Sequence, residues 1–200
     1  MKKFNLLLYS LFMLLLIASC GNREGTTIKG EISNLDNPYI LSTYLSSDTI
    51  VIDTISVNEK GKFYYNINID TLTTFTLYMN NFESAAVIFA DNGQNIKVNG
   101  DALFPDLIRI NGNELNDDIT EFKKLNEDLL KQRGQLLLNL HIDSNSDTLG
   151  RNSIARSEEM ANLNLLNHEL TLQAEEFIIE HPTKHSSLIL ISNFFMNSDN

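Results

Sequence analysis

Cys20 is the only cysteine of this 200-residue chain, and it stands directly behind a short apolar segment near the amino terminus. A cysteine thiolate can act as a nucleophile, bind a metal or form a disulfide. Disulfide exchange requires a second cysteine, because the first forms a mixed disulfide that another thiol must resolve. The chain has no second cysteine, so the neighbours of Cys20 must indicate its chemistry.

The residues before Cys20 have the layout of a bacterial lipoprotein signal. Lys2 and Lys3 form a positive region, residues 6–17 form a hydrophobic region, and small residues precede the cysteine. The hydrophobic region is shorter than the roughly 20 residues that a spanning helix needs. The resemblance to a lipobox implies that the Cys20 sulfur receives a diacylglycerol, that cleavage occurs before Cys20, and that a fatty acid such as palmitate acylates the new amino group.

This signal predicts a protein of the bacterial cell envelope, lipid-anchored in the outer membrane and facing the periplasm. The predicted divisions are a signal peptide (residues 1–19), a lipid-anchored linker (20–25), a β domain (26–112) and a helical segment (113–200). Several acyl chains on one residue give stable anchoring, since each buried methylene contributes about 0.8 kcal/mol. After acylation, the mature chain has no free thiol.

The mature chain is strongly acidic. Removal of residues 1–19 takes away Lys2 and Lys3, so the basic count falls from 15 to 13 against 26 acidic residues, and the net charge is −13. Nucleic-acid binding depends on neutralising phosphates with Lys and Arg, so we expect no nucleic-acid partner. The hydrophobic fraction of 42% is typical of a globular protein.

The first half of the chain predicts β-strands, because apolar and polar residues alternate over short segments between turn residues. Gly61 and Gly93 stand in turns where a positive φ is expected. No helical period precedes residue 113, which indicates an antiparallel sandwich or open barrel of about eight strands. The expected strands cover residues 26–32, 39–45, 50–57, 63–69, 75–79, 85–90, 95–99 and 107–110.

The hydrophobic period then changes to that of an amphipathic helix, which Gly134 interrupts before a polar loop over residues 141–152. We interpret its apolar stripe as a surface for helix packing. The stripe comprises Leu115, Ile119, Phe122, Leu125 and Leu129.

A second long helix is predicted over residues 153–180, and Pro182 ends it. A short third helix begins near Ser186. The sequence therefore predicts an α+β fold: a β-sandwich of about eight strands followed by two long helices and one short helix.

Five short segments follow one another in a characteristic order: residues 28–32, 52–57, 61–63, 87–93 and 110–116. Their order resembles the N-terminal β domain of unknown function found in Bacteroidetes lipoproteins. In that family the domain precedes a helical segment and a TlpA/ResA-like thioredoxin domain. The resemblance implies a relationship to the N-terminal region of thiol:disulfide oxidoreductases.

Four Asp-Thr-aliphatic tripeptides match the acceptor pattern of the general protein O-glycosylation of Bacteroidetes envelope proteins. Asp-Thr pairs also begin strands and turns for structural reasons, so both interpretations stay open. Thr148 is the best candidate because it lies in the predicted loop. The four acceptors are Thr49, Thr54, Thr71 and Thr148.

The chain has no Cys-x-x-Cys pair and no motif typical of catalysis, metal binding or cofactor binding. We expect a non-catalytic envelope lipoprotein whose β domain binds or positions a partner. One alternative is a truncated thiol:disulfide oxidoreductase that lacks its thioredoxin domain, and another is a ligand-binding lipoprotein of nutrient uptake. The expected partners are the membrane, through the lipid anchor, and an envelope protein or a thioredoxin domain.

The lipid anchor gives a direct test. The wild-type protein should partition with membranes and with the detergent phase, whereas the Cys20→Ala variant should stay soluble or unprocessed, because it cannot accept acyl chains. Phase partition of both proteins from a lipoprotein-processing host measures this. A soluble, unacylated mature form of the wild type would contradict the prediction.

Overall fold

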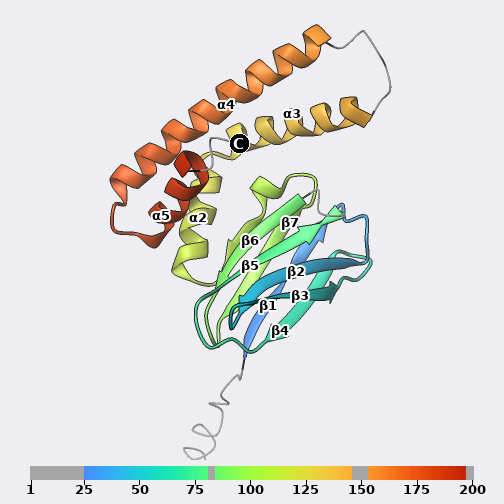
Figure 1. The fold of residues 1–200 in the computed structure, drawn as a ribbon, viewed down its shortest axis with the longest axis vertical. Helices are drawn as coiled ribbons and strands as arrows, with labels where there is room; N and C mark the ends of the chain where they lie inside the picture. Colours follow the sequence, from blue (N-terminus) through green and yellow to red (C-terminus); the bar gives the residue numbers. More distant parts are fainter. Residues whose placement is uncertain (1–24, 81–83, 146–152, 197–200) are drawn as a thin grey trace, which may run out of the picture.

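The computed structural model describes residues 25–80, 84–145 and 153–196. Eight strands form two sheets that pack face to face, and helices follow them in the chain (Figure 1). The predicted α+β fold with an amino-terminal β-sandwich is confirmed. The strands are β1 (Thr26–Ser33), β2 (Tyr39–Ser46), β3 (Thr49–Ser56), β4 (Lys62–Ile67), β5 (Thr73–Met79), β6 (Ser84–Ala90), β7 (Asn95–Asp101) and β8 (Arg109–Asn111).

One sheet has the strand order β4-β1-β7-β8 and the other has the order β3-β2-β5-β6. Neighbouring strands are antiparallel except β1 and β7, which run parallel. A parallel pair requires a long connection, and strands β2 to β6 supply it. This pair differs from the wholly antiparallel prediction.

The core lies between the sheets, where alternate side chains of each strand point inward. Ile28, Phe75, Ile88 and Ile96 are fully buried there. The two turn glycines have the expected backbone conformation, with φ of 76° at Gly61 and 75° at Gly93.

The helices are α2 (Glu114–Leu125), α3 (Glu127–Asn145), α4 (Ser153–Glu180) and α5 (His185–Ile191), followed by a π-helical turn over Ser192–Met196. Figure 1 shows α3 and α4 running side by side as a long hairpin, while α2 and α5 lie nearer the sandwich. Among the described residues, no helix combines the length and apolarity needed to cross a membrane.

The first helical region differs from its prediction. The break falls at Asn126, whose side-chain amide donates to the Phe122 carbonyl oxygen at 3.0 Å, and it separates α2 from α3. Gly134 lies inside α3, where the Phe104 ring packs against it. The helical segment therefore has three long helices where the periodicity predicts two, and α3 continues to Asn145 into the predicted loop.

Two polar side chains of α2 join it to both sheets. Asn116 accepts a hydrogen bond from the Phe89 N–H group of β6 at 3.1 Å and donates one to the Phe89 carbonyl at 2.6 Å. Thr120 accepts from the Ile110 N–H group of β8 at 2.9 Å and donates to the Ile110 carbonyl at 2.6 Å. Because β6 and β8 are edge strands, these bonds satisfy backbone groups that a sheet edge leaves unpaired.

The predicted apolar stripe of α2 is only partly buried. Leu125 is 73% exposed, whereas the polar Asn116 and Thr120 are buried. Phe122 does face a core, where its ring centroid lies 5.7 Å from that of Phe177 and 5.8 Å from that of Phe194. The buried side of α2 is thus partly polar because it faces sheet edges.

The sheet contacts of α2 predict a large loss of stability in the Asn116→Leu variant. The free energy of unfolding should fall by about 2 kcal/mol, because the buried Phe89 N–H group loses its acceptor. Glu121→Leu, on the exposed side of the same helix, is the control and should change it by less than about 0.5 kcal/mol. Urea unfolding measures both free energies. An equal effect of the two substitutions would contradict a stabilising contact between Asn116 and β6.

Candidate functional site

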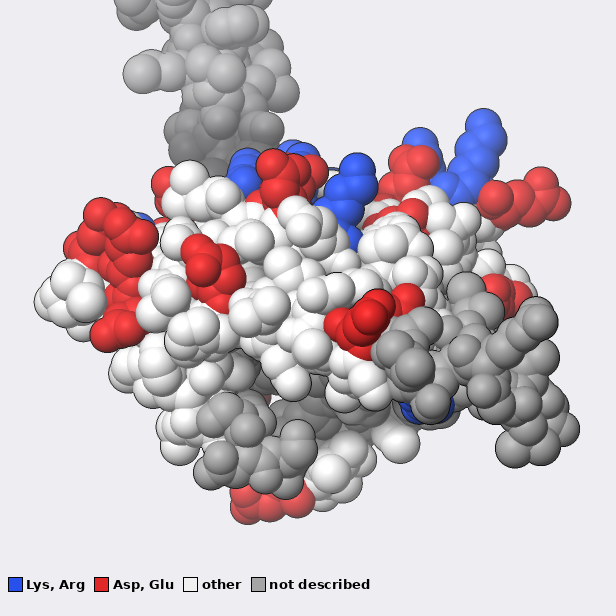
Figure 2. All heavy atoms as spheres, turned by 90° about the horizontal axis from the view of Figure 1, so that it is seen from above, with Lys and Arg blue, Asp and Glu red and all other residues white. Residues whose placement is uncertain are grey.

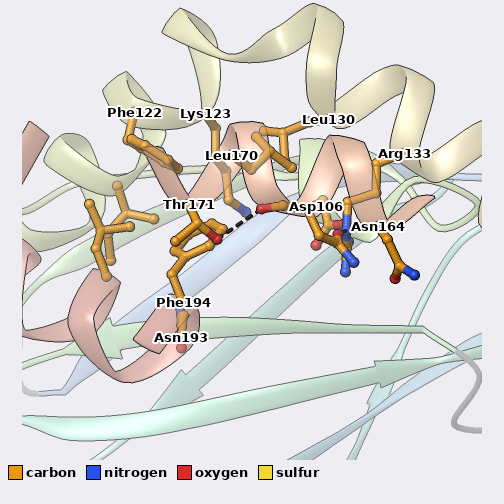
Figure 3. Close-up of a pocket in the computed structure, with 13 residues that line it drawn as sticks. Asp106, Phe122, Lys123, Leu130, Arg133, Asn164, Leu170, Thr171, Asn193 and Phe194 are labelled. Atoms are coloured by element: carbon orange, nitrogen blue, oxygen red, sulfur yellow. Dashed lines mark hydrogen bonds and ion pairs between the residues drawn. The ribbon is translucent and has the colours of Figure 1, made fainter. Parts of the chain in front are cut away.

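A hollow of about 640 Å³ lies among the helices, and its volume is within the range of small-molecule sites. We call it the interhelical pocket (Figure 3). Its wall combines apolar side chains with two cations, one carboxylate and three amides. The lining residues are Asp106, Ile119, Phe122, Lys123, Leu130, Arg133, Asn164, Asn167, Leu170, Thr171, Leu190, Asn193 and Phe194.

Lys123 places a half-buried ammonium group at this pocket. Its Nζ atom donates to the Ile108 carbonyl oxygen at 3.0 Å. Among the described residues no carboxylate forms an ion pair with it. Burial lowers the pKa of Lys123 below its ordinary value, and the charge of Asp106 opposes that shift. The ammonium has three N–H donors, so one hydrogen bond leaves it with unused capacity for an anion.

Arg133 and Asp106 form the second charged feature of the pocket. The Arg133 guanidinium makes an ion pair with Asp106 and donates from Nε to Asn167 Oδ1 at 2.8 Å. The Asn167 carbonyl oxygen in turn accepts from Thr171 Oγ1 at 2.8 Å. Figure 3 shows Lys123 and Arg133 both reaching the hollow, from α2 and α3. Because Asp106 forms its ion pair with Arg133, the ammonium of Lys123 has no ion-pair partner of its own among the described residues.

The position of Lys123 follows from the way α2 meets the sheets. Asn116, Thr120 and Lys123 recur at helical spacing, so they lie on one side of α2. All three bond to backbone groups of the sandwich: Asn116 to β6, Thr120 to β8, and Lys123 to Ile108 just before β8. Lys123 therefore continues the line of sheet contacts to the point where the sandwich ends and the pocket begins.

Two of the sequence-predicted site residues, Cys20 and Thr148, lie outside the described residues. Thr49, Thr54 and Thr71 are exposed. Thr49 begins β3, Thr54 lies on the outer side of β3 opposite Leu41, and Thr71 precedes β5. None of these three threonines lines the interhelical pocket, and their glycosylation stays a prediction.

Sequence reasoning missed Lys123, Arg133 and Asp106. The available signal was a second periodicity on α2, in which polar residues recur at positions 113, 116, 120 and 123. A polar stripe of this kind normally indicates a helix face in contact with water. Only the contacts of these residues with the sheet edges show that this face is packed against the sandwich.

Figure 2 shows acidic side chains spread over the face in view, with basic ones standing among them and forming no continuous basic surface there. Among residues 25–80, 84–145 and 153–196, no three His, Asp or Glu side chains gather as metal ligands would.

Residues 26–119 match a family model described as "Domain of unknown function (DUF4369)". The match covers the whole sandwich and the first half of α2, including Asn116, but it ends before Thr120 and Lys123. The resemblance to a β domain of unknown function is confirmed at this level, while its lipoprotein and thioredoxin context stays a prediction. No curated protein and no solved structure matches the chain.

The half-buried ammonium predicts that Lys123→Met raises the free energy of unfolding at neutral pH by about 1 kcal/mol, since a half-buried charge without an ion-pair partner is replaced by an apolar chain of similar length. Lys124→Met, at the exposed next position, should change it by less than about 0.5 kcal/mol. Chemical denaturation at pH 7 compares them. A clear loss of stability in Lys123→Met would contradict this.

The same group makes wild-type stability depend on pH. The pKa of Lys123 is lower in the folded chain than the ordinary value of about 10.4. Between these two pKa values the unfolded chain binds the extra proton, so the free energy of unfolding should rise with pH in that window. The Lys123→Met variant should lack this part of the rise.

Proposed function

We propose that this chain is a non-catalytic lipoprotein of the bacterial cell envelope, and that its helical segment binds a small molecule with an acidic group. The observation that carries the proposal is the ammonium of Lys123, which lies half-buried beside a pocket of about 640 Å³ without a carboxylate ion-pair partner among the described residues. An acidic ligand group would supply the missing counter-charge. The apolar wall, including Leu130 and Leu170, would cover a hydrocarbon part of the same ligand.

The envelope location is supported by the signal that ends at Cys20. If Cys20 carries the lipid, only residues 20–25 separate the anchor from β1. Six residues span at most about 20 Å. The sandwich would then stay close to the membrane, and a ligand bound by the protein would be concentrated there.

Binding fits the pocket better than catalysis does. A lysine of lowered pKa can act as a nucleophile when a second group moves its protons. Within the part of the chain that the structure describes, Asp106 is the only carboxylate that lines this pocket, and Arg133 holds it in an ion pair. The mature chain also lacks a free thiol for disulfide exchange.

A specific observation supports a second candidate, a role together with a thiol:disulfide oxidoreductase domain. Leu188 of α5 is 63% exposed, and Met196 at the end of the π-helical turn is also well exposed. A following thioredoxin domain would cover such apolar side chains. The nutrient-uptake alternative is compatible with the pocket, although the pocket lies among helices and not in the sandwich loops.

Hexanoate provides a probe with one carboxylate and a short hydrocarbon chain. We expect it to shift the amide resonances of Leu130, Leu170 and Thr171, in a saturable way, in a heteronuclear NMR titration of the wild-type protein. The affinity should fall as the pH rises through the pKa of Lys123, because the ammonium loses its charge.

The controls separate charge recognition from nonspecific apolar binding. Lys124→Met should titrate like the wild type and Lys123→Met should not, while hexylamine, which carries a positive charge, should give no saturable shifts with any of the three proteins. Equal responses to hexanoate and hexylamine, or full binding by Lys123→Met, would rule out the acidic-ligand site.

A further inference from the structure

The two outer faces of the sandwich have opposite character. On the sheet β4-β1-β7-β8, charged residues stand outward, among them Lys29, Glu31, Lys62 and Lys97. On the sheet β3-β2-β5-β6, every outward position is uncharged. These are the odd positions 39–45, the even positions 50–56 and 74–78, and the odd positions 85–89. We call this second surface the uncharged face.

The uncharged face also exposes large apolar side chains. Ile50 is 70% exposed, Ile52 65% and Leu45 60%. A sheet with one face in water normally places polar residues outward, as the opposite sheet does. In a chain of net charge −11, a sheet face without any charge indicates a surface that is covered in use.

The most apolar end of this face lies where the chain would leave for its anchor. Thr26, the first residue of β1, donates from Oγ1 to the Asp91 carbonyl oxygen at 2.7 Å in the turn after β6. The last residue of β6, Ala90, pairs with Thr73 at the start of β5. The start of β5 in turn lies beside the end of β2, because Tyr44 pairs with Phe75.

The hairpin between β2 and β3 therefore lies at the same end of the sandwich as Thr26, as the lower part of Figure 1 shows. Leu45 and Ile50 pair with each other in this hairpin. Leu72, which is also exposed, directly precedes β5 at this end. Three large exposed apolar side chains thus lie at the end of the sandwich where β1 begins.

We propose that the hairpin end of the uncharged face, with Leu45, Ile50 and Leu72, rests on the lipid surface to which the chain is anchored. This inference rests on the lipid anchor at Cys20 in the proposed function. The linker of about 20 Å at full extension keeps this end within reach of the bilayer. Asp48 and Asp70 flank the three apolar residues and would be repelled by anionic headgroups, so the occupant is a zwitterionic lipid surface.

A second copy of the chain fits this surface less well. With about 4.8 Å between strands and 3.4 Å per residue, the face measures roughly 14 Å by 20 Å between Cα positions. Each partner of a standard protein interface buries about 800 Å², which is nearly three times that area. Docking on a bilayer does not require so large a contact area, because the lipid anchor already holds the chain at the membrane.

The composition of the chain allows a clean test, because it has no tryptophan and only one cysteine. The mature chain, residues 20–200, is coupled through Cys20 to a maleimide lipid in phosphatidylcholine vesicles. The Ile50→Trp and Leu45→Trp variants each carry one tryptophan on the hairpin. Tyr64→Trp is the matched control, since Tyr64 is 65% exposed on the outer side of the opposite sheet.

We expect brominated phosphatidylcholine to reduce the fluorescence of the two hairpin tryptophans by about twofold, as for side chains at the headgroup boundary, and to leave Trp at position 64 unchanged. Equal quenching at all three positions, or none at the hairpin, would overturn lipid docking. A blue shift that depends on protein concentration without vesicles would indicate a second copy instead and would also overturn it.

Chemical coupling makes this test independent of natural acylation. If lipid docking fails here while the wild-type protein still partitions with membranes through Cys20, only the docking inference is lost. If the host does not acylate Cys20, the proposed function loses its anchor, whatever the vesicles show.

Discussion

The contact of α2 with both sheet edges is the interaction on which the rest of the structure depends. Asn116 and Thr120 lie one helical turn apart and satisfy backbone groups of β6 and β8, which belong to different sheets. A sheet edge covered in this way cannot add a strand from another chain. The same contact fixes the direction of α2, so it determines where α3 starts and where Lys123 reaches the interhelical pocket. Asp118 of the same helix accepts from Lys184 and Ser186 and attaches the start of α5.

Local patterns were sufficient to predict the strands. Alternation is a property of neighbouring residues, so all eight strands and the turns at Gly61 and Gly93 are confirmed. The parallel pairing of β1 with β7 could not be predicted in this way, because it depends on contacts between residues nearly 70 positions apart. The start of α4 and its end before Pro182 also agree with the sequence.

The predictions about the helices and the site were incomplete because several polar residues there are buried or break a helix. A polar residue on a helix usually faces water, and the periodicity therefore assigned Leu125 to the core and gave Asn116 no partner there. Asn126 breaks the helix where a glycine eight residues later was expected to do so. Lys123 likewise looks like a surface lysine until Ile108 is known to lie beside it. In each case the contacts made in the folded protein determine whether the residue is buried, and the spacing of residues along the chain does not specify those contacts.

The length of α4 has a mechanical consequence. Its 28 residues extend about 42 Å at 1.5 Å per residue, and its carboxy-terminal end is held by the packing of Phe177 against Phe122. The helix is therefore a lever with its pivot beside the pocket. A rotation of about 10° at the pivot displaces the far tip by about 6 Å, because the arm from Phe177 to Ser153 is about 36 Å long. A small rearrangement around Phe177 would thus be amplified at the distant end of the hairpin.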